Sequence, residues 1–139
     1  MSGKAILTAK GLELRRGKKT VLQGFDLELT PGAVTVLLGR NGGGKSSFLR
    51  ACLGLLPWRR GTLEVLGLDP RRRQRQVLEQ VGYVPDDPDA YEWMKARELM
   101  RFLAPHYPSW DTAEAERCLE RFHVPHDVPL SGLSRGQGA

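Results

Sequence analysis

The stretch that decides the fold of this 139-residue chain runs Gly39-Arg40-Asn41-Gly42-Gly43-Gly44-Lys45-Ser46. Its spacing, Gly-x4-Gly-Lys-Ser, is that of a loop that binds phosphate groups. Glycines let the backbone approach an anion closely, so that successive N–H groups converge on it at the positive end of the following helix. Lys45 supplies a full charge for the β- and γ-phosphates, and the Ser46 hydroxyl is a ligand for Mg2+. The stretch therefore predicts that the chain binds a nucleoside triphosphate.

The segments on either side of the loop support this prediction. Residues 33–38 are almost continuously apolar, which indicates a strand covered on both faces, as in a parallel sheet. From Lys45 the apolar residues recur at helical spacing until Pro57, which is expected to end the helix. The alternative is a glycine-rich turn that holds no ligand, and the strand–loop–helix setting disfavours it.

Further strands are expected before and after the loop. The first thirty residues alternate apolar and polar side chains around a turn at Gly17, which predicts a hairpin or a small antiparallel sheet. Short strands are expected around residues 63–65 and at residues 81–84. Together with helices, these strands predict an α/β fold.

Three helices are expected after the loop helix. The first runs from about Asp69 to Gln80 and carries a cluster of arginines between residues 71 and 75. The others cover about 96–104 and 111–122, with Asp111 as the N-cap of the last. The formal net charge of +5 suits nucleic acid, an anionic membrane surface or a phosphate-rich ligand. We interpret the arginine cluster as a solvated helix face.

The cysteines and the apolar runs bear on location. Cys52 and Cys118 are far apart, without metal-ligand or redox spacing, and we interpret both as reduced core thiols. The first residues lack the apolar core of a signal peptide, and no apolar run approaches the roughly 18 residues of a membrane span. An intracellular protein is expected.

Several segments resemble one known family. The residues from Leu37 to Ser47, which include Ser47 after the motif, resemble the phosphate loop of ABC (ATP-binding cassette) ATPases, commonly Gly-Pro-Asn-Gly-Ala-Gly-Lys-Ser/Thr. The run Val81-Gly82-Tyr83-Val84-Pro85 is similar to the segment before the family's Q-loop glutamine, and Leu133-Ser134-Arg135-Gly136-Gln137 resembles its signature, Leu-Ser-Gly-Gly-Gln. With the antiparallel sheet, these landmarks cover nearly the whole chain. Residues 91–94 and 97–99 look like bacterial transporter ATPases rather than DNA-repair members.

The resemblance implies a P-loop NTPase fold of ABC type. It implies a β subdomain and phosphate-loop core over about 1–87, a helical subdomain over about 88–130, and a signature segment over 131–139. The chain stops at Ala139, before the family's Walker B carboxylates and switch histidine, so we expect a partial domain that lacks the C-terminal part of its parallel core. His106, His123 and His126 all precede the signature and do not match the switch.

The chain departs from the family pattern at several positions. Asp86 stands at the Q-loop position, where a carboxylate could still reach Mg2+, although Asp86, Asp87 and Asp89 are better explained by a turn than by a metal cluster. Arg16 replaces the aromatic residue that stacks on adenine, and a guanidinium can also stack on a base. Arg40 and Gly43 replace the usual proline and alanine, and both are compatible with an anion cradle.

The function implied by the resemblance is that of the ATP-binding subunit of an ABC transporter, with ATP and Mg2+ as cofactors. Its implied partners are a second cassette, in a homo- or heterodimer, and a transmembrane permease subunit, at the cytoplasmic face of the membrane. Catalytic turnover is left open because the Walker B carboxylates are absent. The alternatives are a nucleotide-binding or interaction fragment without turnover and a nucleic-acid-associated ABC protein, for which only the charge speaks.

Overall fold

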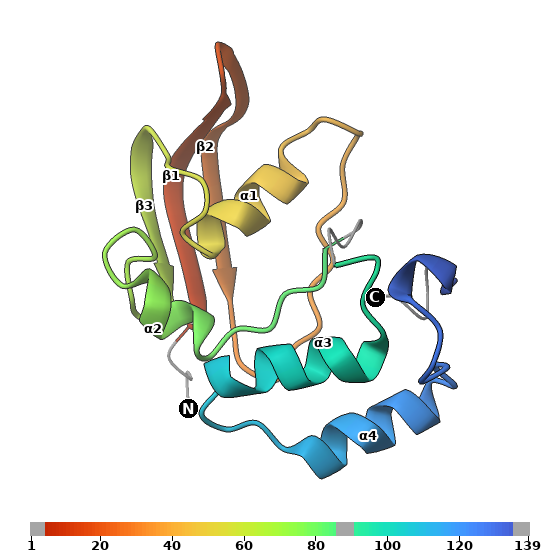
Figure 1. Ribbon diagram of the computed structural model, residues 1–139. Helices are drawn as coiled ribbons and strands as arrows, with labels where there is room; N and C mark the ends of the chain where they lie inside the picture. Colours follow the sequence, from red (N-terminus) through yellow and green to blue (C-terminus); the bar gives the residue numbers. More distant parts are fainter. Residues whose placement is uncertain (1–4, 86–90, 135–139) are drawn as a thin grey trace. The chain divides into compact units, whose positions relative to one another are not determined.

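The computed structural model describes residues 5–85 and 91–134. The chain divides into two compact units, Met1–Gly82 and Tyr83–Ala139, which are described separately below. The first unit contains the sheet and the phosphate loop, and the second contains the C-terminal helices (Figure 1).

The first unit is built on a three-stranded antiparallel sheet. Its strands are β1 (Leu7–Arg16), β2 (Lys19–Leu29) and β3 (Arg60–Val65), in the order β2-β1-β3 (Figure 1). The turn between β1 and β2 includes Gly17, whose φ of 60° is readily adopted only by glycine. The antiparallel hairpin and the short strand around residues 63–65 are therefore confirmed.

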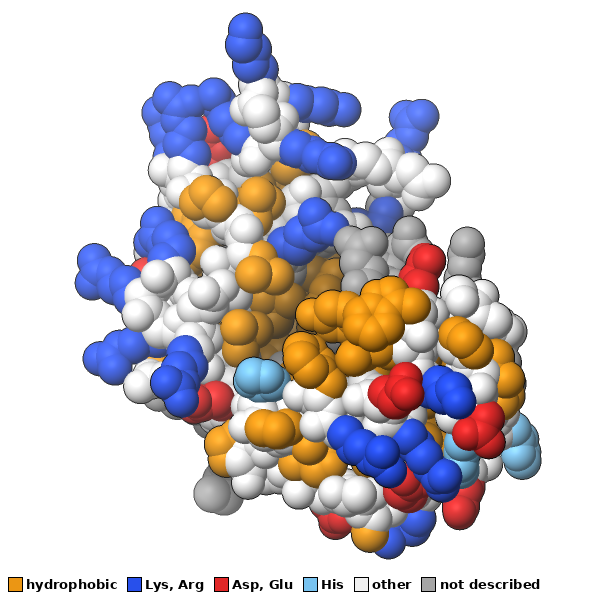
Figure 2. Space-filling model, in the orientation of Figure 1, with side chains coloured by type: hydrophobic (Ala, Val, Ile, Leu, Met, Phe, Trp, Pro, Cys, Tyr) orange, Lys and Arg blue, Asp and Glu red, His pale blue; other side chains and the backbone are white. Residues whose placement is uncertain are grey.

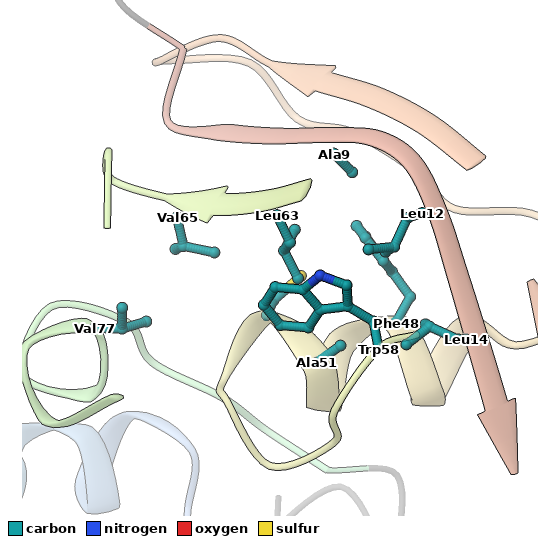
Figure 3. Packing of buried hydrophobic residues seen from close by; sticks show 10 residues of the cluster. Ala9, Leu12, Leu14, Phe48, Ala51, Trp58, Leu63, Val65 and Val77 are labelled. Carbon is teal, nitrogen blue, oxygen red and sulfur yellow. The ribbon is translucent and has the colours of Figure 1, made fainter. Parts of the chain in front are cut away.

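Helix α1 (Lys45–Cys52) covers the core of this unit. A cluster of buried side chains from the strands, from α1 and from the segments after it fills the space between them (Figure 3). It consists of Ala9, Leu12, Leu14, Phe48, Ala51, Cys52, Trp58, Leu63, Val65 and Val77. Burial of these side chains fixes α1, and with it the end of the phosphate loop, against the sheet.

Helix α1 ends five residues earlier than Pro57, the predicted stop. Gly54 has a φ of 69°, and its N–H donates to Ala51 O at 2.9 Å while the Leu55 N–H donates to Arg50 O at 2.8 Å. This pair of hydrogen bonds is the Schellman arrangement, which terminates a helix at a left-handed glycine. A glycine stop therefore acts before the proline does.

Two predicted strands are wrong in the described structure. Residues 33–38 and 81–84 have no strand assignment, and among the described residues no backbone hydrogen bond joins 33–38 to a neighbouring strand. The apolar side chains of the first segment are instead open to solvent, with Val34 96% and Leu38 85% exposed. A strand exists only where a second strand pairs with its N–H and C=O groups, and an apolar run alone cannot supply that partner.

The expected basic helix from Asp69 is shorter than predicted. Helix α2 (Gln74–Leu78) begins only after the arginine-rich turn, in which Arg71 bonds Asp69 at 3.3 Å. The Arg71 guanidinium lies 3.8 Å from the centre of the Trp58 ring, a cation–π contact that covers this buried indole. The arginines of the cluster are exposed, in agreement with a solvated surface.

The second unit is helical in its described part. It contains α3 (Ala96–Leu103), the 3-10 turn η1 (Ala104–His106), α4 (Thr112–Arg121) and the 3-10 turn η2 (Leu130–Gly132). The predicted N-cap is confirmed, since Asp111 Oδ1 accepts the Glu114 N–H at 2.9 Å. Arg97 of α3 and Glu116 of α4 form an ion pair at 3.0 Å.

The cysteine interpretation is confirmed for one residue and wrong for the other. Cys52 is buried, and burial raises the pKa of its thiol to about 12. Cys118 is exposed on α4, because the face of α4 that carries it is not covered by the described part of this unit. Helical periodicity identified the helix but not which face would be covered.

Candidate nucleotide-binding site

The phosphate loop ends at Gly44, which has a φ of 91° and is buried where the loop meets β2. A Cβ at this position would lie 2.7 Å from Val21 O and 2.8 Å from Leu22 Cγ. The Phe48 N–H donates to Gly44 O at 2.8 Å, so α1 begins directly at this residue. Only glycine fits both the backbone angle and the close approach to β2.

The preceding glycines form a tight turn. Gly42 has a φ of 77°, and the Gly43 N–H donates to Arg40 O at 3.0 Å. A Cβ on Gly43 would lie 2.9 Å from the same Arg40 oxygen. The alanine that is usual at this position in ABC ATPases would therefore force this turn open, which gives the Gly43 departure a structural reason.

The Lys45 side chain folds back over the loop. Its Nζ donates to Gly39 O at 2.6 Å and to Arg40 O at 3.0 Å. Among the described residues no carboxylate lies within ion-pairing distance of this ammonium. Neutral carbonyls are weaker partners for an ammonium than phosphate oxygens, so the full charge of Lys45 remains available to an anion.

The first turn of α1 adds a second positive element. It holds no acidic residue, and its N-cap, Gly44, has no side chain to cap the backbone N–H groups. Ser46 is exposed in this turn, whereas Ser47 is half-buried. The helix dipole and the uncapped N–H groups favour an anion at this end.

A small pocket of about 80 Å³ lies at the inner side of the loop. Its walls are Leu22, Phe25, Leu37, Leu38, Gly43, Gly44, Lys45 and Phe48. It is much smaller than the roughly 300–1,000 Å³ of small-molecule sites and has mainly apolar walls. We interpret it as a packing gap behind the loop rather than as the place of a ligand.

Arg16, predicted to face the base, is the exposed last residue of β1. It lies opposite Lys19 in the hairpin register, and Lys19 precedes by two residues the Val21 carbonyl that Gly44 approaches. The hairpin end is therefore near the loop along β2, at roughly 7 Å for two strand residues. The sequence did not reveal this contact, because Gly44 and Val21 belong to separate elements.

Several predicted site residues are not placed by the structure. Asp86, Arg135, Gly136 and Gln137 lie outside the described residues, as do Asp87 and Asp89. Of the signature segment, Leu133 is half-buried and donates its N–H to Leu130 O at 3.1 Å, and Ser134 is exposed. Within the described ranges no group of three or more acidic, histidine or cysteine side chains could hold a metal ion. Asn41 and Arg40 are exposed on the loop.

The family model described as "ABC transporter" matches residues 22–139, which include the loop and most of the chain. This chain belongs to the ABC transporter family. The predicted family and its α/β P-loop fold are thus confirmed, with the exception of the strands corrected above. In the described ranges no helix is long and apolar enough to cross a membrane.

The relatives of this ABC protein include ATP-binding subunits. The cytochrome c biogenesis ATP-binding export proteins CcmA 2 of Cupriavidus metallidurans and CcmA of Bordetella bronchiseptica are 33% and 36% identical to it. Each match covers 96% of this chain, but 64% and 60% of the respective relative. The chain thus spans less than two thirds of the length of these relatives.

Solved structures agree with the sequence relatives. The ATP-binding subunit of an ABC transporter matches with a TM-score of 0.80 at 26% identity, covering 96% of this chain and 58% of that one. The protein cbiO1 from Clostridium perfringens, described as part of the ABC transporter complex cbiONQ, matches with a TM-score of 0.72 at 25% identity, covering 96% and 57%. Both likenesses extend to the loop and the sheet that positions it.

Proposed function

We propose that the chain binds MgATP through the loop at residues 39–46, as the nucleotide-binding part of an ABC transporter ATPase. The observation that carries the proposal is the construction of the loop. Gly44 is pressed against β2 at a position where no Cβ fits, and the next residue, Lys45, holds an ammonium over the loop through two neutral carbonyls. A structural turn requires neither an all-glycine backbone nor a lysine without a carboxylate partner.

Each residue of the loop has a proposed role. The backbone N–H groups of Asn41 and of Gly42 to Gly44 bind phosphate oxygens, and Lys45 moves from Gly39 O and Arg40 O to the β- and γ-phosphates. Ser46 supplies a hydroxyl for Mg2+, and the Ser47 backbone N–H binds the first phosphate of the chain at the helix end. Mg2+ would neutralise part of the phosphate charge when bound.

The proposed partners follow from the relatives. The cbiO1 structure is described as part of a transporter complex, and the CcmA proteins are described as export proteins. We propose that this chain likewise works with a second cassette and a transmembrane permease subunit at the inner face of the membrane. The transported substrate is then selected by the membrane subunit, not by the residues described above.

Calorimetric titration of MgATP tests the binding proposal. Lys45→Ala is expected to weaken binding about 10- to 100-fold, because hydrogen bonds to charged groups contribute roughly 1.5–3 kcal/mol each. The matched control is Lys10→Ala, which removes an exposed lysine of β1 opposite Thr62 of β3. Equal affinities of wild type and Lys45→Ala would sink the proposal, as would an affinity unchanged by removal of Mg2+.

A further inference from the structure

The unit that contains the loop has no aromatic face to offer a nucleobase. Its aromatic residues are Phe25, Phe48 and Trp58, and all take part in the hydrophobic core. Phe48 is 2% exposed and packs edge-on against Phe25, with ring centroids 5.0 Å apart. Trp58 is 6% exposed, is covered by Arg71, and donates its Nε1–H to Gly61 O at 3.2 Å.

The hairpin end near the loop is cationic instead. Figure 2 shows Lys and Arg side chains gathered around this end of the sheet, at the top of the picture. Arg16, Lys18 and Lys19 are exposed there and form no ion pair within the described residues. The nearby acidic residue, Glu13, is already engaged by Arg15 at 3.1 Å and by Arg60 at 3.8 Å.

These cations recognise charge and not base identity. Ammonium and guanidinium groups attract phosphate groups whatever nucleoside is attached. A guanidinium can also stack on a base, but every base has a π-face, so stacking tolerates any base. Arg16 therefore replaces an aromatic platform with a group that does not depend on adenine.

Hydrogen-bond readout of the base is absent as well from the described residues. A site rejects the wrong ligand strongly when that ligand leaves a buried polar group unpaired. The described residues contain no buried side-chain nitrogen or oxygen without a partner. No side chain is thus held ready, in the dry interior, for the edge of a particular base.

We infer that this site selects the triphosphate and accepts any base, so that ATP, GTP, CTP and inorganic tripolyphosphate bind with similar affinity. The inference rests on the proposed binding of triphosphate at the loop and names the ligand class more closely. The determinants are the loop with Lys45, together with the cations at Arg16, Lys18 and Lys19.

Competition titrations with the four Mg2+-loaded ligands test the inference on the full chain. The affinities of wild type are expected to lie within about threefold of each other, since no contact distinguishes the bases. Arg16→Tyr restores an aromatic ring and is expected to bind ATP about 5- to 100-fold more tightly than Arg16→Gln, which removes the same charge without adding a ring. Tripolyphosphate has no base to stack, and it should bind the two variants equally.

The outcomes separate the inference from the proposal beneath it. If wild type binds ATP more than about tenfold tighter than CTP and tripolyphosphate, a base contact exists and the inference is overturned, while the phosphate loop stands. The inference also fails if Arg16→Tyr and Arg16→Gln bind ATP alike, because Arg16 would then not lie beside the base. If Lys45→Ala binds all four ligands as well as wild type does, the proposed function itself has failed.

Discussion

Replacement of Gly44 by alanine is the sharpest test of how the loop is built. At a φ of 91° an L-residue is strained, at a cost of about 1–2 kcal/mol. The added Cβ would also lie 2.7 Å from Val21 O and 2.8 Å from Leu22 Cγ, and overpacking of this kind costs about 1–3 kcal/mol. Gly44→Ala is therefore expected to lower the free energy of unfolding by about 2–5 kcal/mol, a large share of the roughly 5–15 kcal/mol of a typical domain.

Gly42→Ala is the matched control in the same loop. Gly42 has a φ of 77°, but a Cβ there would meet nothing within 4 Å, so only the backbone cost of about 1–2 kcal/mol remains. Urea unfolding followed by circular dichroism gives both free energies, provided that the slope with denaturant is unchanged. Equal losses in the two variants would refute the argument that β2 presses directly on the loop.

Two further predictions follow from burial. Val34→Ser combined with Val36→Ser is expected to reduce self-association of the chain, because these exposed side chains favour contact with other apolar surfaces; an unchanged mass in light scattering would contradict this. Burial raises the pKa of Cys52 to about 12 from an ordinary value of 9.0, so the unfolded chain loses this proton first and stability should fall as pH rises through this range. Cys52→Ala should flatten that fall in urea unfolding, whereas Cys118→Ala, at an exposed thiol, should not.

The features predicted correctly from the sequence are those that depend on local signals. The spacing of glycines before Lys45 placed the loop and the start of α1, and alternation around Gly17 placed the hairpin. Asp111 was identified as an N-cap from its position before a helical pattern, and it is one. Each of these structures is determined by residues within a few positions of each other, so the pattern and the structure coincide.

The features that were missed depend on partners far along the chain. Residues 33–38 have the composition of a covered strand, yet strand formation requires a neighbour that the composition does not name. The contact of Gly44 with Val21 and Leu22 likewise joins separate elements, and it explains why the last glycine of the loop cannot be replaced. The sequence thus predicted which residues form the site, but not which strand supports them.

The two departures in this site act in the same direction. Gly43 lets the loop close on Arg40 O, where a Cβ would lie 2.9 Å away, and it also adds backbone freedom that a bound phosphate must remove. A glycine costs roughly 0.5–1 kcal/mol more than alanine to order, and Arg16 gives up the stacking of about 1–3 kcal/mol that an aromatic ring offers. Both changes weaken the non-electrostatic part of binding. The energy of recognition then has to come from charge, which is what Lys45 and the unpaired cations at Lys18 and Lys19 provide.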